Sequence, residues 1–138
     1  MLSFLMALAT AHHMSAPAQP RSPAEVVRAM FESFNQHDAR SMQALYAADA
    51  RLTSSDFCGP RSKRDIQRTY ESLFHAFPDI EDAIETMVVE RDTVAVRFVA
   101  SSGTGKMRLT IHTFLKVKEG LIISDDSVFD NGGRPCEQ

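Results

Sequence analysis

Four β-rich runs joined by very short linkers fill the second half of the chain, and no other feature constrains its fold as strongly. The runs are residues 80–90, 93–101, 106–117 and 121–130. Linkers this short allow only hairpins, so neighbouring strands are expected to pair antiparallel. The pattern predicts a meander with one face packed inside the protein and one face toward solvent or a partner.

Helical patterns precede these runs. Residues 22–25, Ser-Pro-Ala-Glu, predict a capped helix start, and apolar residues then recur at helical spacing. Asp38 is expected to cap a second, short helix, which we extend to Tyr46. A second capping box at residues 62–65 opens a third helix, and Pro78 ends it. Helices followed by a meander predict an α+β fold, in which three N-terminal helices cover one face of a curved antiparallel sheet of four to six strands.

Length and charge exclude several classes of partner. The 138 residues predict one domain with a core, and the formal net charge of −3 gives no basic footprint for nucleic acid. The basic residues of 61–68 are few and interrupted by Asp65, as on a solvated helix face. No spacing of His, Cys and carboxylate residues resembles a metal site, so we expect no metal and no cofactor. The apolar run at residues 2–9 is too short to span a bilayer, so we expect no membrane partner.

The two cysteines lie far apart in the sequence. Cys58 belongs to a Cys-Gly-Pro turn, and Cys136 lies close to the C-terminus. Neither is part of a metal or redox motif. A disulfide between them requires the C-terminal tail to fold back, and we expect free thiols instead.

The last β-rich run sets carboxylates among apolar residues. At the strand period of two, Asp126 and Asp130 share one face with Ile122 and Val128, and Asp125 lies on the other face. A carboxylate on an inner face is costly unless it is paired or functional. Asp126 and Asp130 would stand roughly 13 Å apart, which is too far to share a proton but suits two polar points in one pocket.

Four stretches of the sequence resemble a known family. They are Leu45–Leu52, Phe74–Ile80, Met87–Val96 and Lys116–Asp130, and they follow the family's order and spacing. On them the chain resembles the nuclear transport factor 2-like superfamily, and within it the SnoaL-like polyketide cyclase and ketosteroid-isomerase-like group. The resemblance implies a cone-shaped sheet around a long helix, with an apolar pocket open at one end. It also implies a homodimer formed through the outer face of the sheet.

The resemblance covers residues 22–133, which we define as the SnoaL-like domain. Residues 1–21 precede it as a flexible leader, which is an upstream extension before a start at Met14, a weak signal peptide, or an extra helix. We favour the extension, which places the protein in the cytoplasm. A signal peptide at residues 1–18 would direct it to the periplasm or outside the cell. Tail residues 134–138 either cover the mouth of the pocket or hang free.

The resemblance also places candidate acid/base residues on the last strands. Asp130 matches the family's late-strand aspartate, and apolar neighbours there would raise its pKa by desolvation. The alternative is that Asp130 caps the turn at residues 131–133. Asp126 stands where many relatives have Trp, so it is a second acid or a sign of a wetter strand end. His112 would act as a general acid/base or hold an oxyanion if its face lines the pocket, and is otherwise a core or interface residue.

Asp56 completes the candidate catalytic set, because ketosteroid isomerases place a proton-shuttling aspartate close to this position. The first helix has no Tyr to serve as the oxyanion donor of those enzymes, which argues against steroid isomerase chemistry. We expect the ligand to contact aromatic and apolar side chains of the helices and of the last two strands. These are Phe31, Phe34, Tyr46, Tyr70, Phe114 and Val128. For the two tyrosines the alternative is a structural role as core rings.

The leading interpretation is a cofactor-independent enzyme of cyclase or isomerase type. Its substrate would be a hydrophobic carbonyl or polycyclic molecule, and Asp130 would move a proton next to the carbonyl with help from His112 or Asp126. Two alternatives stay open. One is a non-catalytic domain that binds a small apolar ligand, and the other is a dimerising scaffold with a vestigial pocket.

Overall fold

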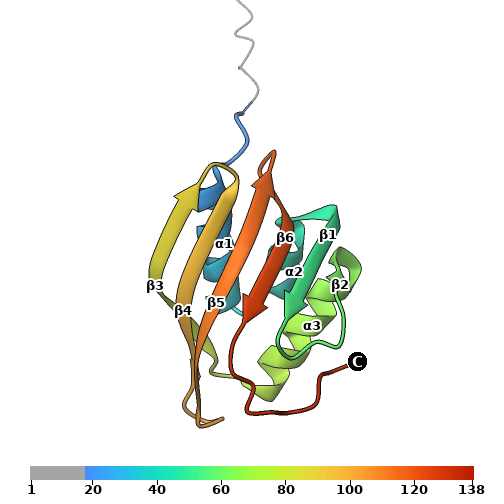
Figure 1. The fold of residues 1–138 in the computed structure, drawn as a ribbon, viewed down its shortest axis with the longest axis vertical. Coiled ribbons are helices and arrows are strands. Elements are labelled where there is room, and N and C mark those ends of the chain that lie inside the picture. The colour runs from blue at the N-terminus through green and yellow to red at the C-terminus, as the bar shows by residue number, and fades with distance from the viewer. Residues whose placement is uncertain (1–17) are drawn as a thin grey trace, which may run out of the picture.

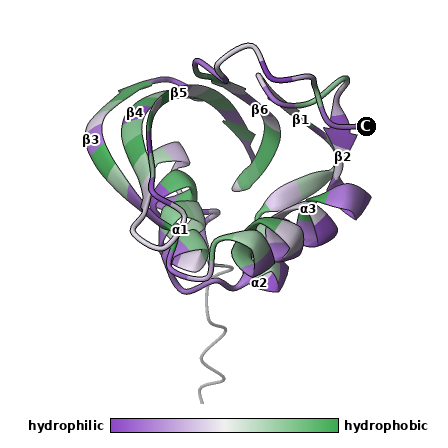
Figure 2. Cartoon of the chain, turned by 90° about the horizontal axis from the view of Figure 1, so that it is seen from below, coloured by the Kyte–Doolittle hydropathy of each residue, from purple (hydrophilic) through white to green (hydrophobic). Residues whose placement is uncertain are grey.

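The computed structural model describes residues 18–138, so the alternatives for the leader concern residues that lie mostly outside this range. The helices are α1 (Pro23–Asn35), α2 (Ala39–Ala44) and α3 (Lys63–Ala76), and the strands are β1 (Tyr46–Ser54), β2 (Arg61–Ser62), β3 (Glu81–Glu90), β4 (Thr93–Ser102), β5 (Met107–Lys118) and β6 (Leu121–Val128). The strands form one open sheet in the order β2-β1-β6-β5-β4-β3, which curves around the helices (Figure 1 and Figure 2). The α+β cone expected from the sequence is confirmed.

Both longer helices begin at a capping box, as the sequence predicts. At α1 the Glu25 amide donates to the Ser22 hydroxyl (3.3 Å), and the Ser22 amide donates to the Glu25 carboxylate (2.7 Å). The same motif opens α3. These reciprocal bonds satisfy backbone amides that have no partner within the helix, so each helix starts at a fixed residue.

The core fills the concavity of the sheet. Phe31 of α1 packs edge-on against Phe98 of β4, with 4.9 Å between the ring centroids. In Figure 2 the ribbon of α1 and the strand ribbons that curve around it carry green segments, which mark hydrophobic residues. The Asn35 side chain at the end of α1 bonds to the backbone of Asp82 in both directions (2.8 and 2.9 Å), which fixes α1 to β3. Within residues 18–138, no helix has the length and apolar character needed to cross a lipid bilayer.

Strands β3 to β6 form the predicted antiparallel meander. The turn between β5 and β6 has positive φ at Glu119 (52°) and Gly120 (77°), as a tight hairpin with right-handed twist requires. β1 joins the same sheet but pairs with β6 in parallel. This one parallel pair departs from the expected antiparallel sheet, because two strands so distant in the sequence leave no local signal of their pairing.

A side chain at Gly120 is predicted to destabilise the protein. A Cβ there would lie 3.2 Å from the Cβ of Pro20, and φ is +77°. Gly120→Ala is expected to lower the free energy of unfolding by about 1–2 kcal/mol, since the left-handed conformation alone costs an L-residue that much. Chemical denaturation measures the loss. Gly59→Ala is the matched control, because a Cβ at Gly59 meets nothing within 4 Å, and equal stability of the two variants would contradict the prediction.

A β-bulge in β6 changes which side chains face inward. The register between β5 and β6 shifts at Ile123, which has no partner of its own on β5. Alternation restarts after the bulge. Ile122 and Asp125 are therefore both buried, whereas strict alternation placed Ile122 on the face of Asp126.

Tyr46 is the first residue of β1, and its assignment to a helix is wrong. α2 ends at Ala44, and the Ile122 amide of β6 donates to the Leu45 carbonyl at 2.8 Å. Tyr46 itself pairs with Ile122. The spacing of Met42, Leu45 and Tyr46 fits a longer helix as well as a helix that runs into a buried strand, and pairing with β6 decides between them.

The C-terminal tail folds back over the domain. Cys58 and Cys136 form a disulfide with 4.9 Å between their Cα atoms, so the expectation of free thiols is wrong. The Glu137 amide donates to the Asp56 carbonyl (2.6 Å), and the Glu137 carbonyl accepts from the Cys58 amide (3.0 Å). Figure 1 shows the tail passing below β6 and ending beside α3. The tail therefore does not hang free, because the disulfide and these backbone hydrogen bonds attach it to the loop after β1.

Candidate functional site

Four of the predicted site residues lie together on the convex, outer face of the sheet. His112 pairs with Val128, and Phe114 pairs with Asp126. All four residues are exposed, Phe114 by 57% and Val128 by 51%. The bulge in β6 and the alternation of β5 turn all four outward. Phe114 and Val128 therefore do not line an inner pocket, the condition set for a catalytic His112 is not met, and Asp126 fits the alternative of a wetter strand end.

Asp130 and Asp56 lie at the edges of the domain. Asp130 follows the end of β6, is exposed, and accepts a hydrogen bond from the Gly132 amide at 2.8 Å. Asp130 therefore caps the turn at residues 131–133, which was the alternative to a catalytic role. Asp56 lies on the loop after β1, where the Arg134 guanidinium approaches its carboxylate to 3.4 Å. Both carboxylates thus hold the C-terminal segment in place.

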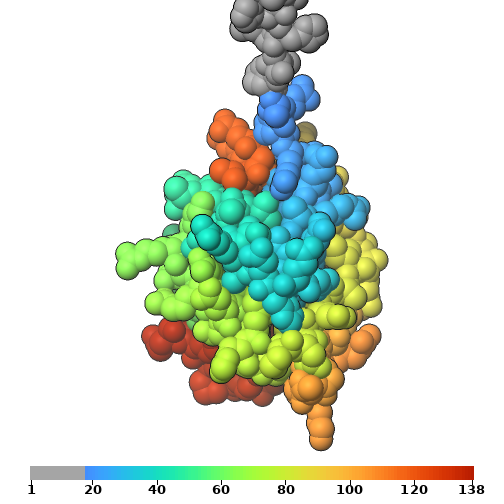
Figure 3. Space-filling model, turned by 180° about the vertical axis from the view of Figure 1, so that it is seen from behind, coloured from blue at the N-terminus to red at the C-terminus, as the bar shows by residue number. Residues whose placement is uncertain are grey.

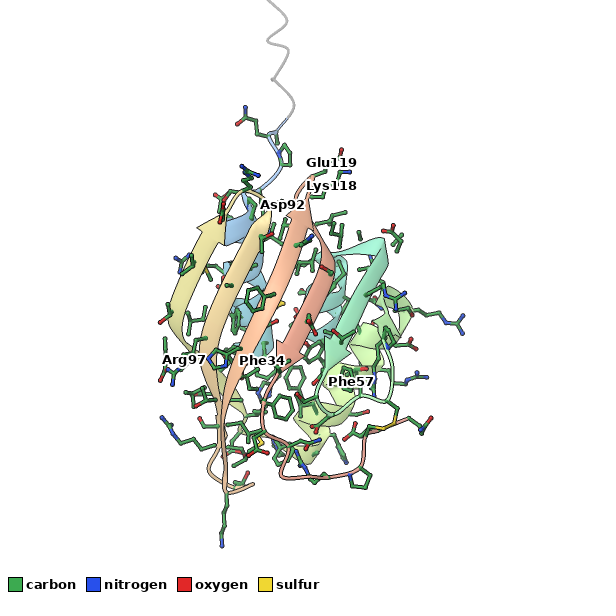
Figure 4. The ribbon with its side chains drawn as sticks, viewed as in Figure 1. Phe34, Phe57, Asp92, Arg97, Lys118 and Glu119 are labelled. Carbon is green, nitrogen blue, oxygen red and sulfur yellow. A yellow bond between two sulfur atoms is a disulfide. The ribbon has the colours of Figure 1, made fainter. Side chains whose placement is uncertain are left out.

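The predicted site residues of the helical side belong to the core. Phe31, Phe34 and Tyr46 are buried. Tyr70 packs edge-on against Phe34, with 5.9 Å between the ring centroids, and Figure 4 shows Phe34 inside the cone, behind the sheet. These rings belong to the core cluster or pack directly against it.

Asp125, which was not among the predicted site residues, occupies this interior. Asp125 is 3% exposed and accepts hydrogen bonds from the hydroxyls of Tyr46 and Thr113, each at 2.7 Å. The Ser127 hydroxyl lies 3.5 Å away. The signal in the sequence is the adjacent pair Asp125 and Asp126, because neighbouring strand residues point to opposite faces and one of the two must face inward.

The interior shifts the pKa values of its ionisable groups. Burial raises the pKa of Asp125, because the charged form loses its hydration, and the hydrogen bonds from Tyr46 and Thr113 offset this only in part. Burial also raises the pKa of Tyr46, and the nearby Asp125 carboxylate raises it further. Tyr46 therefore stays protonated as a donor, while Asp125 takes up a proton more readily than an exposed aspartate.

A second carboxylate faces the same interior. Asp82 lies on β3, and its Oδ1 atom is buried without a hydrogen-bond partner among the described residues. Desolvation raises the pKa of Asp82 to about 8. Burial, and then the charges of Asp125 and Asp82, raise the pKa of Tyr70. Two carboxylates and two phenols thus share one apolar enclosure.

A cavity of about 880 Å³ lies between α3, the loop after β1 and the C-terminal tail. One face of α3 lines it at helical spacing, from Asp65 to Ala76, and residues 56–61 and 137–138 complete the lining. Of the predicted site residues, Asp56 alone lines this cavity. Figure 4 shows Phe57 on the loop over α3.

Apolar side chains join the cavity to the core. Phe57, Leu73 and Phe77 line the cavity and also pack against the core cluster. Asp125 itself lies deeper in the core, and neither it nor its hydrogen-bond partners Tyr46 and Thr113 line this cavity.

The sequence matches the model of a known protein family. Residues 27–124, more than half of the chain, match the model of the SnoaL-like domain. The protein belongs to the SnoaL-like domain family. The resemblance noted in the sequence is confirmed. No curated protein sequence is significantly similar to this SnoaL-like chain.

Solved structures share the fold of this SnoaL-like protein. IdmH of Streptomyces antibioticus, a candidate polyketide cyclase, is 22% identical with a TM-score of 0.70 over 81% of this chain and 94% of IdmH. A candidate ketosteroid isomerase of Kribbella flavida is 19% identical with a TM-score of 0.68 over 84% of this chain and 83% of that one. A de novo designed protein with a curved β-sheet is 15% identical with a TM-score of 0.67, over 80% and 86% of the two chains. Likeness at these identities establishes the fold, which by itself defines no activity.

Proposed function

We propose that this SnoaL-like protein is an enzyme that performs cofactor-independent acid/base chemistry on a hydrophobic, carbonyl-bearing molecule. The observation that supports the proposal is the buried Asp125 carboxylate, which accepts hydrogen bonds from the hydroxyls of Tyr46 and Thr113. Asp125 takes the role that the sequence suggested for Asp130. The reason is that Asp125 is buried, whereas Asp126 and Asp130 are exposed.

The interior supplies the parts of a proton transfer next to a carbonyl. Asp125 accepts a proton from the carbon beside the carbonyl and returns it to another position, which a raised pKa favours near neutral pH. Tyr46 donates to the carboxylate and fixes its orientation. The proposed route for the substrate leads from the cavity past Phe57 and Phe77, which are half-buried, line the cavity and pack against the core cluster that contains Tyr46.

Carboxyl-resolved NMR titration tests the proposal. Asp125 is expected to titrate above its ordinary value of 3.8. Asp125→Asn assigns the signal, and Asp126→Asn is the matched control, because it changes the adjacent carboxylate on the outer face. With an enolisable polycyclic ketone, exchange of the proton beside the carbonyl with deuterated solvent is expected to fall by about 100-fold in Asp125→Asn and to persist in Asp126→Asn.

Two results would refute this assignment. One is an ordinary titration of Asp125, which would mean that the carboxylate is solvated in solution. The other is solvent exchange at the wild-type rate in Asp125→Asn, which would mean that another group moves the proton.

The outer face of the sheet is the proposed surface for a homodimer. It exposes Val88, Phe114 and Val128, and exposed apolar clusters of this kind are typical of interfaces. Arg97 of β4 pairs with His112 of β5 and forms an ion pair with Glu85 of β3, whereas Asp126 of β6 pairs with Phe114 on the other side of β5. A second copy related by a two-fold axis through β5 brings the arginine of each copy toward the aspartate of the other.

Phe114→Glu is expected to convert the proposed homodimer into a monomer, because association would bury a charge at the centre of the apolar cluster. Size-exclusion chromatography with light scattering measures the mass. Lys116→Glu is the control, since Lys116 is exposed on the same face but lies two residues from the cluster centre. A wild-type monomer at high protein concentration would exclude the dimer.

A further inference from the structure

The C-terminal tail forms part of the cavity wall. Glu137 and Gln138 line the cavity, and Cys136 is bonded to Cys58 on the opposite loop. An isolated parallel β-bridge between Phe57 and Glu137 also attaches the tail to this loop. In Figure 3 the tail (red) lies against the lower part of α3 (green). The disulfide therefore holds the Glu137 side chain at the cavity.

Arg61 is the more buried of the two arginines that line this cavity. Its side chain is 20% exposed, and its guanidinium lies 3.9 Å from the centroid of the Phe57 ring. Nη1 donates to the Thr69 hydroxyl at 2.8 Å. Stacking and this hydrogen bond hold the planar guanidinium in one orientation, and a guanidinium has further N–H groups to offer a carboxylate.

The Glu137 carboxylate faces Arg61 without forming a short hydrogen bond. Nη2 of Arg61 lies 3.7 Å from the Glu137 carboxylate, whose side chain is 68% exposed. Arg68, which also lines the cavity, instead bonds to Asp65 at 2.9 Å and is 79% exposed. Arg61 is thus the fixed guanidinium, and its partner is a loosely held carboxylate that another anion can replace.

We propose that the cavity binds an apolar carboxylate, and that the disulfide-held tail competes with it. The ligand's carboxylate would replace that of Glu137 on Arg61, and its apolar body would lie against Leu73 and Phe77. The disulfide keeps the competitor at a high effective concentration. The proposal thus names the class of ligand and a mechanism by which the tail regulates its binding. It rests on the proposed function only in one respect, because it takes this ligand to be the substrate.

Release of the tail requires reduction of the disulfide. A dithiol supplies the two electrons. Its thiolate attacks one sulfur of the Cys58–Cys136 bond, the other cysteine leaves as a thiol, and the second thiol of the dithiol resolves the mixed disulfide. The products are two cysteine thiols and the oxidised dithiol. Compartments that keep thiols reduced therefore favour the open cavity, and oxidising ones favour the closed cavity.

Isothermal titration with a simple probe pair tests the proposal. The probes are naphthalene-2-carboxylate and the uncharged naphthalene-2-carboxamide. The carboxylate is expected to bind about tenfold more tightly after reduction with dithiothreitol, or in oxidised Glu137→Gln, than to the oxidised wild type. The carboxamide is expected to show no such gain. Arg61→Gln should remove the preference for the carboxylate, whereas Arg64→Gln, a charge-matched change on the exposed side of α3, should retain it.

The outcomes separate this proposal from the one about catalysis. Equal affinities for carboxylate and carboxamide in the reduced protein would overturn the ligand class. Carboxylate affinity that changes neither on reduction nor in Glu137→Gln would overturn competition by the tail. Because Glu137→Gln keeps the disulfide, the affinity measured with this variant tests competition by the tail even if reduction destabilises the fold. The readout is binding, so an ordinary pKa of Asp125 would refute the catalytic role and leave this result intact.

Discussion

Asp125→Ala is expected to lower the free energy of unfolding by about 4 kcal/mol. The substitution removes the acceptor of two buried hydroxyls, those of Tyr46 and Thr113, and each unsatisfied buried donor costs about 1–3 kcal/mol. It also leaves a void in a well-packed interior, which adds to the loss. Urea denaturation at pH 5 measures the difference from the wild type.

Two further variants distinguish the loss of the hydrogen-bond acceptor at Asp125 from the loss of any carboxylate on β6. Asp125→Asn keeps an oxygen in the same place and is expected to lose less than about 1.5 kcal/mol. Asp126→Ala changes the neighbouring exposed carboxylate, which accepts from the Thr53 hydroxyl at 2.6 Å, and is expected to cost less than about 1 kcal/mol. Similar losses for Asp125→Ala and Asp126→Ala would show that the interior network contributes little.

Asp82 is expected to make the protein less stable at alkaline pH. Desolvation raises its pKa in the folded state to about 8, above its ordinary value, so the folded state holds a proton that the unfolded state releases. The resulting stability is full below pH 4 and is lost as the pH rises to about 8. Relaxation and water entry reduce the effect of the full shift, so we expect Asp82→Asn to be more stable than the wild type by about 3 kcal/mol at pH 9 and similar to it at pH 4.

Thermal and urea unfolding across this pH range measure the effect of Asp82. Glu81→Gln is the matched control, because Glu81 is the preceding, exposed carboxylate of β3, and it should follow the wild-type profile. The contribution of Asp125 is common to all three proteins and cancels in the comparison. A pH profile of Asp82→Asn parallel to that of the wild type would contradict the prediction.

Local chemistry determined the elements of the fold. The capping boxes at Ser22 and Ser62 position α1 and α3, and the turn at Glu119 and Gly120 joins β5 to β6. Each of these signals acts within a few residues, where hydrogen bonds and allowed φ values limit the backbone directly. The order of helices and hairpins could therefore be predicted from the sequence, and so could the family.

The candidate site was predicted less accurately from the sequence, because it depends on which face of the sheet each strand residue occupies. One extra residue at Ile123 restarts the alternation of β6, so the inward carboxylate is Asp125 rather than Asp126. A shift of a single residue exchanges the two faces of a strand, and the apolar pattern around Ile123 fits either register. Only pairing with β5 fixes it.

Sequence by itself thus determined the helix starts, the meander and the SnoaL-like family. Tertiary structure decided three other features: the parallel pairing of β1 with β6, the disulfide of Cys58 with Cys136, and the burial of Asp125 under Tyr46. Each joins segments far apart in the chain. Its free energy comes from contacts that exist only once the cone has closed, so no short stretch of residues carries its signal.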